Sequence, residues 1–307
     1  MIEDEVIQVI LRNQGSQGYE TIYSSKDVEI DTDLLPYLLP RAKTNKKNPN
    51  YYFKYPINKD LTLIKLVQDD GVDAYNRFKA KVILFIVPND VYESVGGLTY
   101  FASPLWLETI PMDTNKPLDY ETDFESRDDI KQKYRDEFTT SFHEFLLDKL
   151  LLYNNVIISL TDTEEYEKQR FFILRSLAYL DYKLPAFFRN QITIKTLANS
   201  PETNLANCIL INDVKDIPEL PQGTILLNYP TMKDQKDLIP RTGSLPRKIL
   251  EIETAEEREV LTRILIDSKA VAKEELVPSA EYSQLATRFG IKDKHIFNRL
   301  FKSLIFH

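Results

Sequence analysis

Residues 78–90 have the sequence FKAKVILFIVPND and contain the longest apolar run of the chain, Val82–Val87. A run of this length is typical of a buried β-strand and falls far short of the roughly 20 apolar residues that span a bilayer. Pro88-Asn89-Asp90 should end the strand, because proline and short polar side chains favour turns. The same residues could cap a helix from Val91, which Gly96-Gly97 would then end.

The residues before this strand favour an antiparallel sheet. Glu5–Leu11 and Tyr19–Ser24 are short strands separated by turn-forming residues, so we expect a hairpin. Tyr51–Pro56 is an aromatic-rich strand, and Leu61–Val67 alternates apolar and polar residues as a half-buried strand does. We therefore predict an α/β (α+β) protein whose first domain, residues 1–120, is built on an antiparallel sheet.

Helix and strand patterns alternate after residue 120, which predicts a second, α/β domain at 121–245. The strongest helical periodicity runs from Ile130 to Tyr153. The further predicted elements are a strand at 156–160, a helix at 164–180, and strands at 191–197, 207–212 and 224–228. The polar, proline-containing segments 111–123 and 234–247 are predicted linkers, so the domain boundaries fall near residues 120 and 245.

The last domain, residues 246–307, is predicted to be helical and to end in a pattern that resembles a helix-turn-helix. Gly290 suits the turn between two helices, and an apolar stripe at Ile296, Leu300 and Leu304 suits the second helix. The candidate nucleic-acid-binding residues on its other faces are Lys292, Lys294, His295, Asn298 and Arg299. Residues 276–307 hold five basic and two acidic residues, a local charge of +3. The net charge of −8 leaves the remainder at −11, which would repel phosphates.

The motifs of common catalytic and cofactor sites are missing from the sequence. It contains no phosphate loop, dinucleotide-binding fingerprint, nucleophile elbow or His-Glu-x-x-His motif. Its single cysteine, Cys208, cannot form an internal disulfide or a cysteine-based zinc site. We expect His143 to lie partly exposed on its helix. The sequence therefore predicts a cytoplasmic protein with no cofactor, no metal and no chemical active site.

Several short motifs, spread over roughly residues 5–230, are similar to those of a known family. They are the opening strand, Gly18-Tyr19, Tyr23-Ser24-Ser25, the path through Gly71 and Asn76-Arg77 into Val82–Val87, then Leu174–Leu177, Leu184–Arg189 and Ile192–Thr196. Together they resemble the prokaryotic GTPase-associated proteins, longin-like relatives of eukaryotic DENN proteins. The chain departs from that family after Arg77, where Phe78-Lys79-Ala80 stands in place of an expected Gly and a later His.

The resemblance implies a longin-like first domain, a DENN-like α/β domain and a partner that is a small GTPase. DENN proteins promote guanine-nucleotide exchange by binding and reshaping the GTPase switch loops, which requires no catalytic motif. The leading hypothesis is thus a GTPase regulator or adaptor, and the alternative is a DNA-binding regulator acting through the tail. Candidate partner-binding residues are Tyr52, Tyr55, Arg77 and Arg189, since Tyr and Arg are frequent interface hot spots. The tyrosines would equally suit the core of their own domain, and Arg189 could instead anchor a loop.

Overall fold

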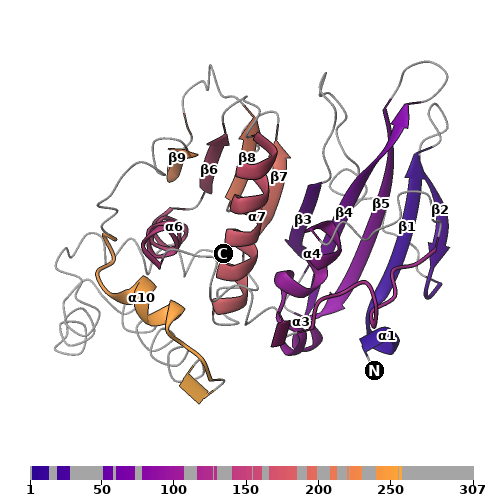
Figure 1. The fold of residues 1–307 in the computed structure, drawn as a ribbon, viewed down its shortest axis with the longest axis horizontal. Coiled ribbons are helices and arrows are strands. Elements are labelled where there is room, and N and C mark those ends of the chain that lie inside the picture. The colour runs from indigo at the N-terminus through magenta and orange to yellow at the C-terminus, as the bar shows by residue number, and fades with distance from the viewer. Residues whose placement is uncertain are drawn as a thin grey trace.

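The structure, a computed structural model, is of the mixed α/β class, as the sequence predicts (Figure 1). It describes residues 2–13, 19–27, 51–57, 60–72, 78–106, 116–126, 128–129, 140–153, 155–160, 166–184, 192–198, 208–212, 220, 222–229, 240–254 and 256–257. The elements in chain order are α1 (Ile2–Glu5), β1 (Ile7–Asn13), β2 (Tyr19–Ser24), β3 (Tyr51–Pro56), β4 (Leu61–Val72), β5 (Phe78–Pro88), α3 (Asn89–Val95), α4 (Leu98–Trp106), α6 (Thr140–Leu152), β6 (Asn155–Leu160), α7 (Tyr166–Lys183), β7 (Ile194–Ala198), β8 (Cys208–Asn212), β9 (Thr224–Asn228) and α10 (Leu245–Leu250).

All the described strands belong to one sheet, in the order β2-β1-β5-β4-β3-β7-β8-β6-β9. The strands β2, β1, β5, β4 and β3 pair in antiparallel fashion, and we call them the antiparallel half. The strands β7, β8, β6 and β9 pair in parallel, and we call them the parallel half. The predicted hairpin is confirmed, because β1 pairs with β2. The domain boundaries near residues 120 and 245 stay predictions.

Both faces of the sheet are buried at the centre of the antiparallel half, on β4 and β5. Helices α3 and α4 cover one face (Figure 1), and there the Phe85 ring contacts Phe101 of α4. Ile64 pairs with Phe85 across the strands and lies in the same apolar core. Leu63, Lys65 and Leu84 alternate with them on the opposite face and are also buried, with exposed fractions of 1–3%. The prediction of a half-buried strand at 61–67 is therefore wrong for its central residues. Its alternating polar positions, threonine and lysine, are buried along with the apolar ones.

The turn after β5 sets the position of the two helices on this face. Helix α3 starts at Asn89 rather than near Val91, and its N-cap residue is Pro88, without a side-chain cap. Asn89 Oδ1 instead accepts a hydrogen bond of 2.7 Å from the Thr62 hydroxyl on β4. The predicted end of the helix is confirmed, since Gly96 has a φ of 102° and terminates it.

The segment 116–126, which includes part of the linker predicted at 111–123, packs against the antiparallel half. Leu118 and Phe124 are buried in the apolar core. The side-chain amide of Gln8, on β1, forms two hydrogen bonds with the backbone of Leu118, one as donor and one as acceptor. Gln8 Nε2 donates to the Leu118 carbonyl at 3.2 Å, and the Leu118 N–H donates to Gln8 Oε1 at 2.9 Å.

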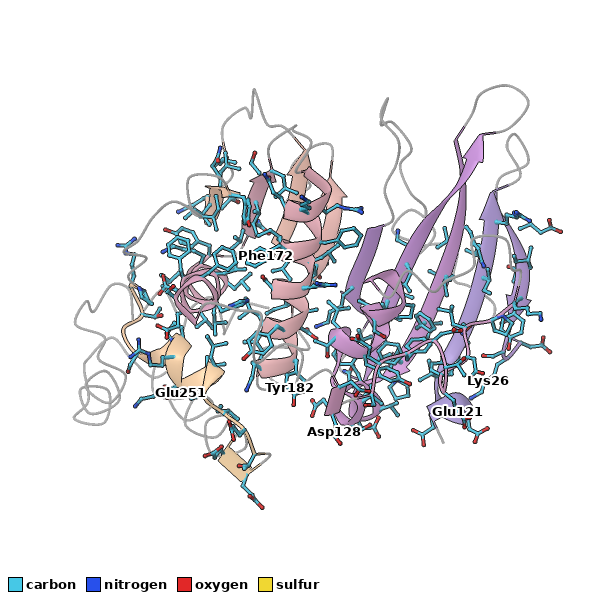
Figure 2. The ribbon with its side chains drawn as sticks, in the orientation of Figure 1. Lys26, Glu121, Asp128, Phe172, Tyr182 and Glu251 are labelled. Carbon is cyan, nitrogen blue, oxygen red and sulfur yellow. The ribbon has the colours of Figure 1, made fainter. Side chains whose placement is uncertain are left out.

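Helices α6 and α7 pack against the parallel half. The rings of Phe142 and Phe172, one from each helix, lie 5.3 Å apart and both contact Tyr229 at the end of β9 (Figure 2). His143 is 1% exposed, and its ring lies 5.3 Å from that of Tyr179 on α7. The prediction of a partly exposed His143 is therefore wrong, because this side of α6 faces α7 rather than solvent.

Residues 240–252, which include part of the linker predicted at 234–247, are bonded to α6 and α7. Asp148 Oδ1 accepts two bonds of 2.7 Å from Thr242, one from its N–H and one from its hydroxyl. Arg247 Nε donates to Glu144 Oε1 at 2.9 Å.

A helix cap follows at Thr254, whose hydroxyl accepts from the Glu257 N–H at 3.1 Å. The Glu253 and Thr254 N–H groups bond to the Glu257 carboxylate and lower its pKa. The predicted helix-turn-helix lies outside the described residues.

We expect Gln8→Met to destabilise the fold by about 1–3 kcal/mol, because it strips the buried Leu118 backbone of both side-chain partners. Urea unfolding should show a lower midpoint at an unchanged slope. Glu121→Met, at an exposed position of the same segment, is the control and should shift the free energy of unfolding by no more than about 0.5 kcal/mol. Equal effects of the two substitutions would contradict the role of Gln8.

Candidate functional site

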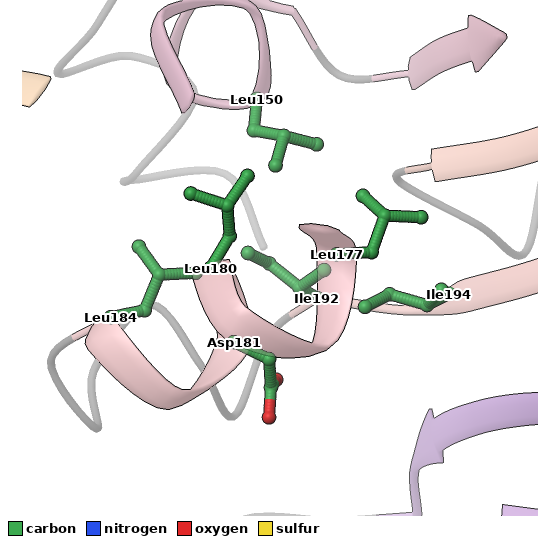
Figure 3. Close-up of a pocket in the computed structure, with 7 residues that line it drawn as sticks. All are labelled: Leu150, Leu177, Leu180, Asp181, Leu184, Ile192 and Ile194. Carbon is green, nitrogen blue, oxygen red and sulfur yellow. The ribbon is translucent and has the colours of Figure 1, made fainter. Parts of the chain in front are cut away.

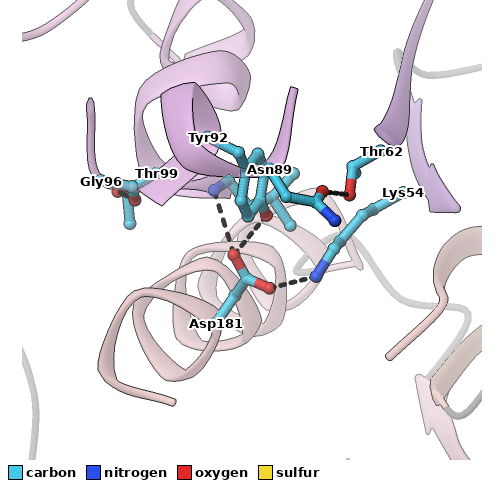
Figure 4. A network of polar contacts seen from close by, with 8 residues as sticks. Lys54, Thr62, Asn89, Tyr92, Gly96, Thr99 and Asp181 are labelled. Atoms are coloured by element: carbon cyan, nitrogen blue, oxygen red, sulfur yellow. Dashed lines mark hydrogen bonds and ion pairs between the residues drawn. The ribbon is translucent and has the colours of Figure 1, made fainter. Parts of the chain in front are cut away.

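A cluster of buried polar contacts lies where the antiparallel half meets α7 (Figure 4). Lys54, in the middle of β3, places its Nζ 2.6 Å from Asp181 Oδ1 on α7. The two side chains are 0% and 1% exposed. Burial of single charges is strongly unfavourable, so each of these side chains requires the other.

Two more donors meet the same carboxylate. The Tyr92 hydroxyl, on α3, donates to Asp181 Oδ2, and the Leu98 N–H at the start of α4 donates to the same oxygen at 3.1 Å. Lys54 Nζ also lies 5.1 Å from the centre of the Tyr92 ring, a favourable cation–π distance. Four elements, β3, α3, α4 and α7, are thereby joined at one side chain. We call these four residues the Asp181 network.

The α3–α4 turn approaches Asp181 closely because it contains glycine. Gly97 has a φ of 66°, in the left-handed region that favours glycine. A Cβ on Gly97 would lie 2.8 Å from Asp181 Oδ2 and 3.1 Å from the Tyr92 ring. No side chain fits there without displacing the carboxylate. Gly96 thus ends α3. Gly97 leaves room for the Asp181 carboxylate, which accepts a hydrogen bond from the first N–H of α4.

A small apolar hollow lies on the other side of Asp181, between α6, α7 and β7 (Figure 3). Its lining residues are Leu150, Leu177, Leu180, Asp181, Leu184, Ile192 and Ile194. It has no space for the centre of a water molecule. Figure 3 shows the Asp181 carboxylate pointing away from the leucine side chains. The hollow is therefore a packing gap, which offers neither a ligand nor a water to the charged groups beside it.

The Asp181 network is suited to holding elements in place. Its acceptor oxygens are occupied by protein donors, and all of its side chains are buried. Elsewhere in the described part of the chain, no group of three or more His, Cys, Asp or Glu side chains is placed to hold a metal ion. Among the helices described, none combines the length and apolar character needed to cross a membrane.

The sequence-predicted site residues stand apart from this network or outside the described residues. Tyr52 and Tyr55 lie on β3 beside Lys54, but their side chains are not among those described. Arg77 and Arg189 lie outside the described residues, as do the tail candidates Lys292, Lys294, His295, Asn298 and Arg299. Sequence reasoning missed Lys54 and Asp181. The available signal was a lysine inside an aromatic strand and an aspartate among leucines at helical spacing.

Comparison of the sequence with models of known protein families gave no match, and comparison with curated proteins gave none either. The functional argument consequently depends on the chain's own residues, on its fold and on the motif resemblance described above.

Gly97→Ala should destabilise the protein by about 1–3 kcal/mol more than Gly96→Ala. Both positions have a positive φ, so backbone strain affects both variants. Only the Gly97 methyl would crowd Asp181, since the nearest atom to a Cβ on Gly96 is at an ordinary 3.4 Å. Chemical unfolding of the two variants measures the difference. An equal loss of stability in the two variants would mean that crowding of Asp181 by the Gly97→Ala methyl does not contribute to the free energy of unfolding.

Proposed function

We propose that this protein is a regulator or adaptor that binds a small GTPase, with DENN-like guanine-nucleotide exchange as the activity to test first. It acts in this proposal by binding, through a protein surface, and needs no chemical active site. The substrate of any exchange is the nucleotide-loaded GTPase itself. The DENN-like and longin-like assignments of the two halves are part of the same proposal.

One structural observation carries most of the support. The chain forms an antiparallel half first and then an α/β half with parallel strands, joined in one sheet. This is the order that the motif resemblance implies, with the longin-like unit before the DENN-like unit. The described parts of the motifs quoted for it lie in both halves, on β1, β2, the centre of β5, α7 and β7. A protein that acts by shape needs a rigid scaffold, and the buried core shared by the two halves meets that need.

A binding experiment with a panel of small GTPases tests the proposal. Each GTPase is presented nucleotide-free, GDP-loaded and loaded with a non-hydrolysable GTP analogue. An exchange factor should bind the nucleotide-free form most tightly and should accelerate release of a fluorescent GDP analogue. An adaptor should prefer one loaded form and leave the release rate unchanged. Failure to bind any member in any form would refute the proposal.

Charge reversal at the two candidate arginines tests the predicted surface. We expect Arg77→Glu or Arg189→Glu to weaken GTPase binding at least about tenfold if either residue is an interface hot spot. Lys116→Glu is the matched control, because it makes the same charge change at an exposed site and should leave affinity within about twofold. Titration by fluorescence anisotropy gives the three affinities. Binding that is intact in both arginine variants would exclude these positions from the interface.

The DNA-binding alternative has its own outcome in the same set of measurements. A wild-type protein that binds DNA with a steep salt dependence, which Lys292→Glu with Lys294→Glu abolishes, would favour the tail as the functional surface. Wild-type protein that binds a GTPase but not DNA would end that alternative.

A further inference from the structure

The backbone junction between the two halves of the sheet is narrow. In the described part of the chain, strand β3 pairs with β7 through two residue pairs, Phe53 with Lys195 and Lys54 with Ile194. By contrast, β3 forms six pairs with β4 on its other side, and β6 forms five with β8. We call the β3–β7 junction the seam. Because strand pairing is cooperative along its length, two pairs specify the register far more weakly than six.

The Asp181 network crosses the seam at this same point. Lys54 is one of the two β3 residues that pair with β7, and its ammonium reaches over to Asp181 on α7. Helix α4, whose first N–H binds Asp181, also packs along α7. The Asp181 network thus lies at the seam, where the strands share two residue pairs. Its hydrogen bonds and ion pair add directional contacts where the backbone provides few.

A buried ion pair fixes geometry more than it adds stability. Its Coulomb attraction is largely offset by desolvation, and well-packed apolar replacements are often as stable. The geometric requirement remains, because the Asp181 carboxylate must lie within hydrogen-bond distance of three donors on β3, α3 and α4 at the same time. A small rotation of α7 would leave at least one of these buried groups without its hydrogen bond, which costs free energy because the group stays removed from solvent.

We propose that the Asp181 network is a conformational latch. It holds α7, and with it the parallel half, in one arrangement against the antiparallel half. Its loss lets the seam open locally while each half keeps its own strand pairing. This inference is independent of the proposed function, because it concerns motion between the halves and not the identity of a partner.

Hydrogen exchange of the full chain, read peptide by peptide, tests the latch. In Asp181→Asn the exchange of β3, β7 and the α3–α4 turn should accelerate at least about tenfold, because removing one partner of a buried pair is strongly destabilising. Exchange at the β1–β5 pairing and in β6 should stay within about twofold of wild type. Unchanged exchange at the seam would overturn the proposal. Equal acceleration in every strand would do so too, since the protein would then open as one unit.

Asp148→Asn is the matched control. Asp148 is also fully buried and also pairs with a lysine, but it lies on α6 and holds Thr242. Its substitution should loosen residues 240–252 and leave the seam unchanged, and acceleration at the seam would count against a role specific to Asp181.

A double variant keeps the test decisive if Asp181→Asn fails to fold. Lys54→Met with Asp181→Leu removes both charges of this buried ion pair together, so we expect it to fold. Its seam should still exchange at least about tenfold faster than wild type, because the Tyr92 hydroxyl and the Leu98 N–H have lost their acceptor. Wild-type exchange at the seam of this variant would overturn the latch.

Discussion

Asp181 accepts hydrogen bonds from a lysine, a tyrosine and a backbone N–H, and all of these residues are buried. The placement of several elements depends on this one carboxylate. It sets α7 against β3, and β7 and β8 lie beneath that helix (Figure 1). It also fixes the turn between α3 and α4. Tyr92 on α3 stacks on Phe101 of α4, and Phe101 in turn contacts Phe85 on β5. One group therefore relates the two halves of the sheet.

The local part of this fold follows from its sequence. The apolar run of β5, the aromatic strand β3 and the strand at 224–228 are present, because short-range pattern determines them. Segments 116–126 and 240–252 contain prolines or many polar residues and resemble linkers, yet each is bound by a distant side chain, Gln8 or Asp148. Such contacts depend on residues about a hundred positions away, and periodicity carries no information about them. The same limit hid the pairing of β1 with β5 and of β3 with β7.

The Asp181 network was beyond sequence reasoning for a related reason. Lysine and aspartate are usually exposed, so in a single sequence they indicate surface unless a partner is visible. Here the partners stand 127 residues apart, on a strand and a helix. Sequence reasoning singled out Tyr52 and Tyr55 as possible anchors and passed over Lys54 between them. Gly96-Gly97 was interpreted as a helix end, which is correct, but its second role, making room for a carboxylate, required the coordinates.

The distance along the chain between Lys54 and Asp181 also has a consequence for biosynthesis. A ribosome adding ~5–20 residues per second needs on the order of ten seconds to pass from β3 to α7 and β7. During that interval Asp181 has not yet been synthesised, so the contact that joins β3 to α7 cannot form. The free edge of β3 is open over the same period, and open strand edges pair readily with other chains. Translational pausing between these two elements would therefore leave the nascent protein most exposed to aggregation.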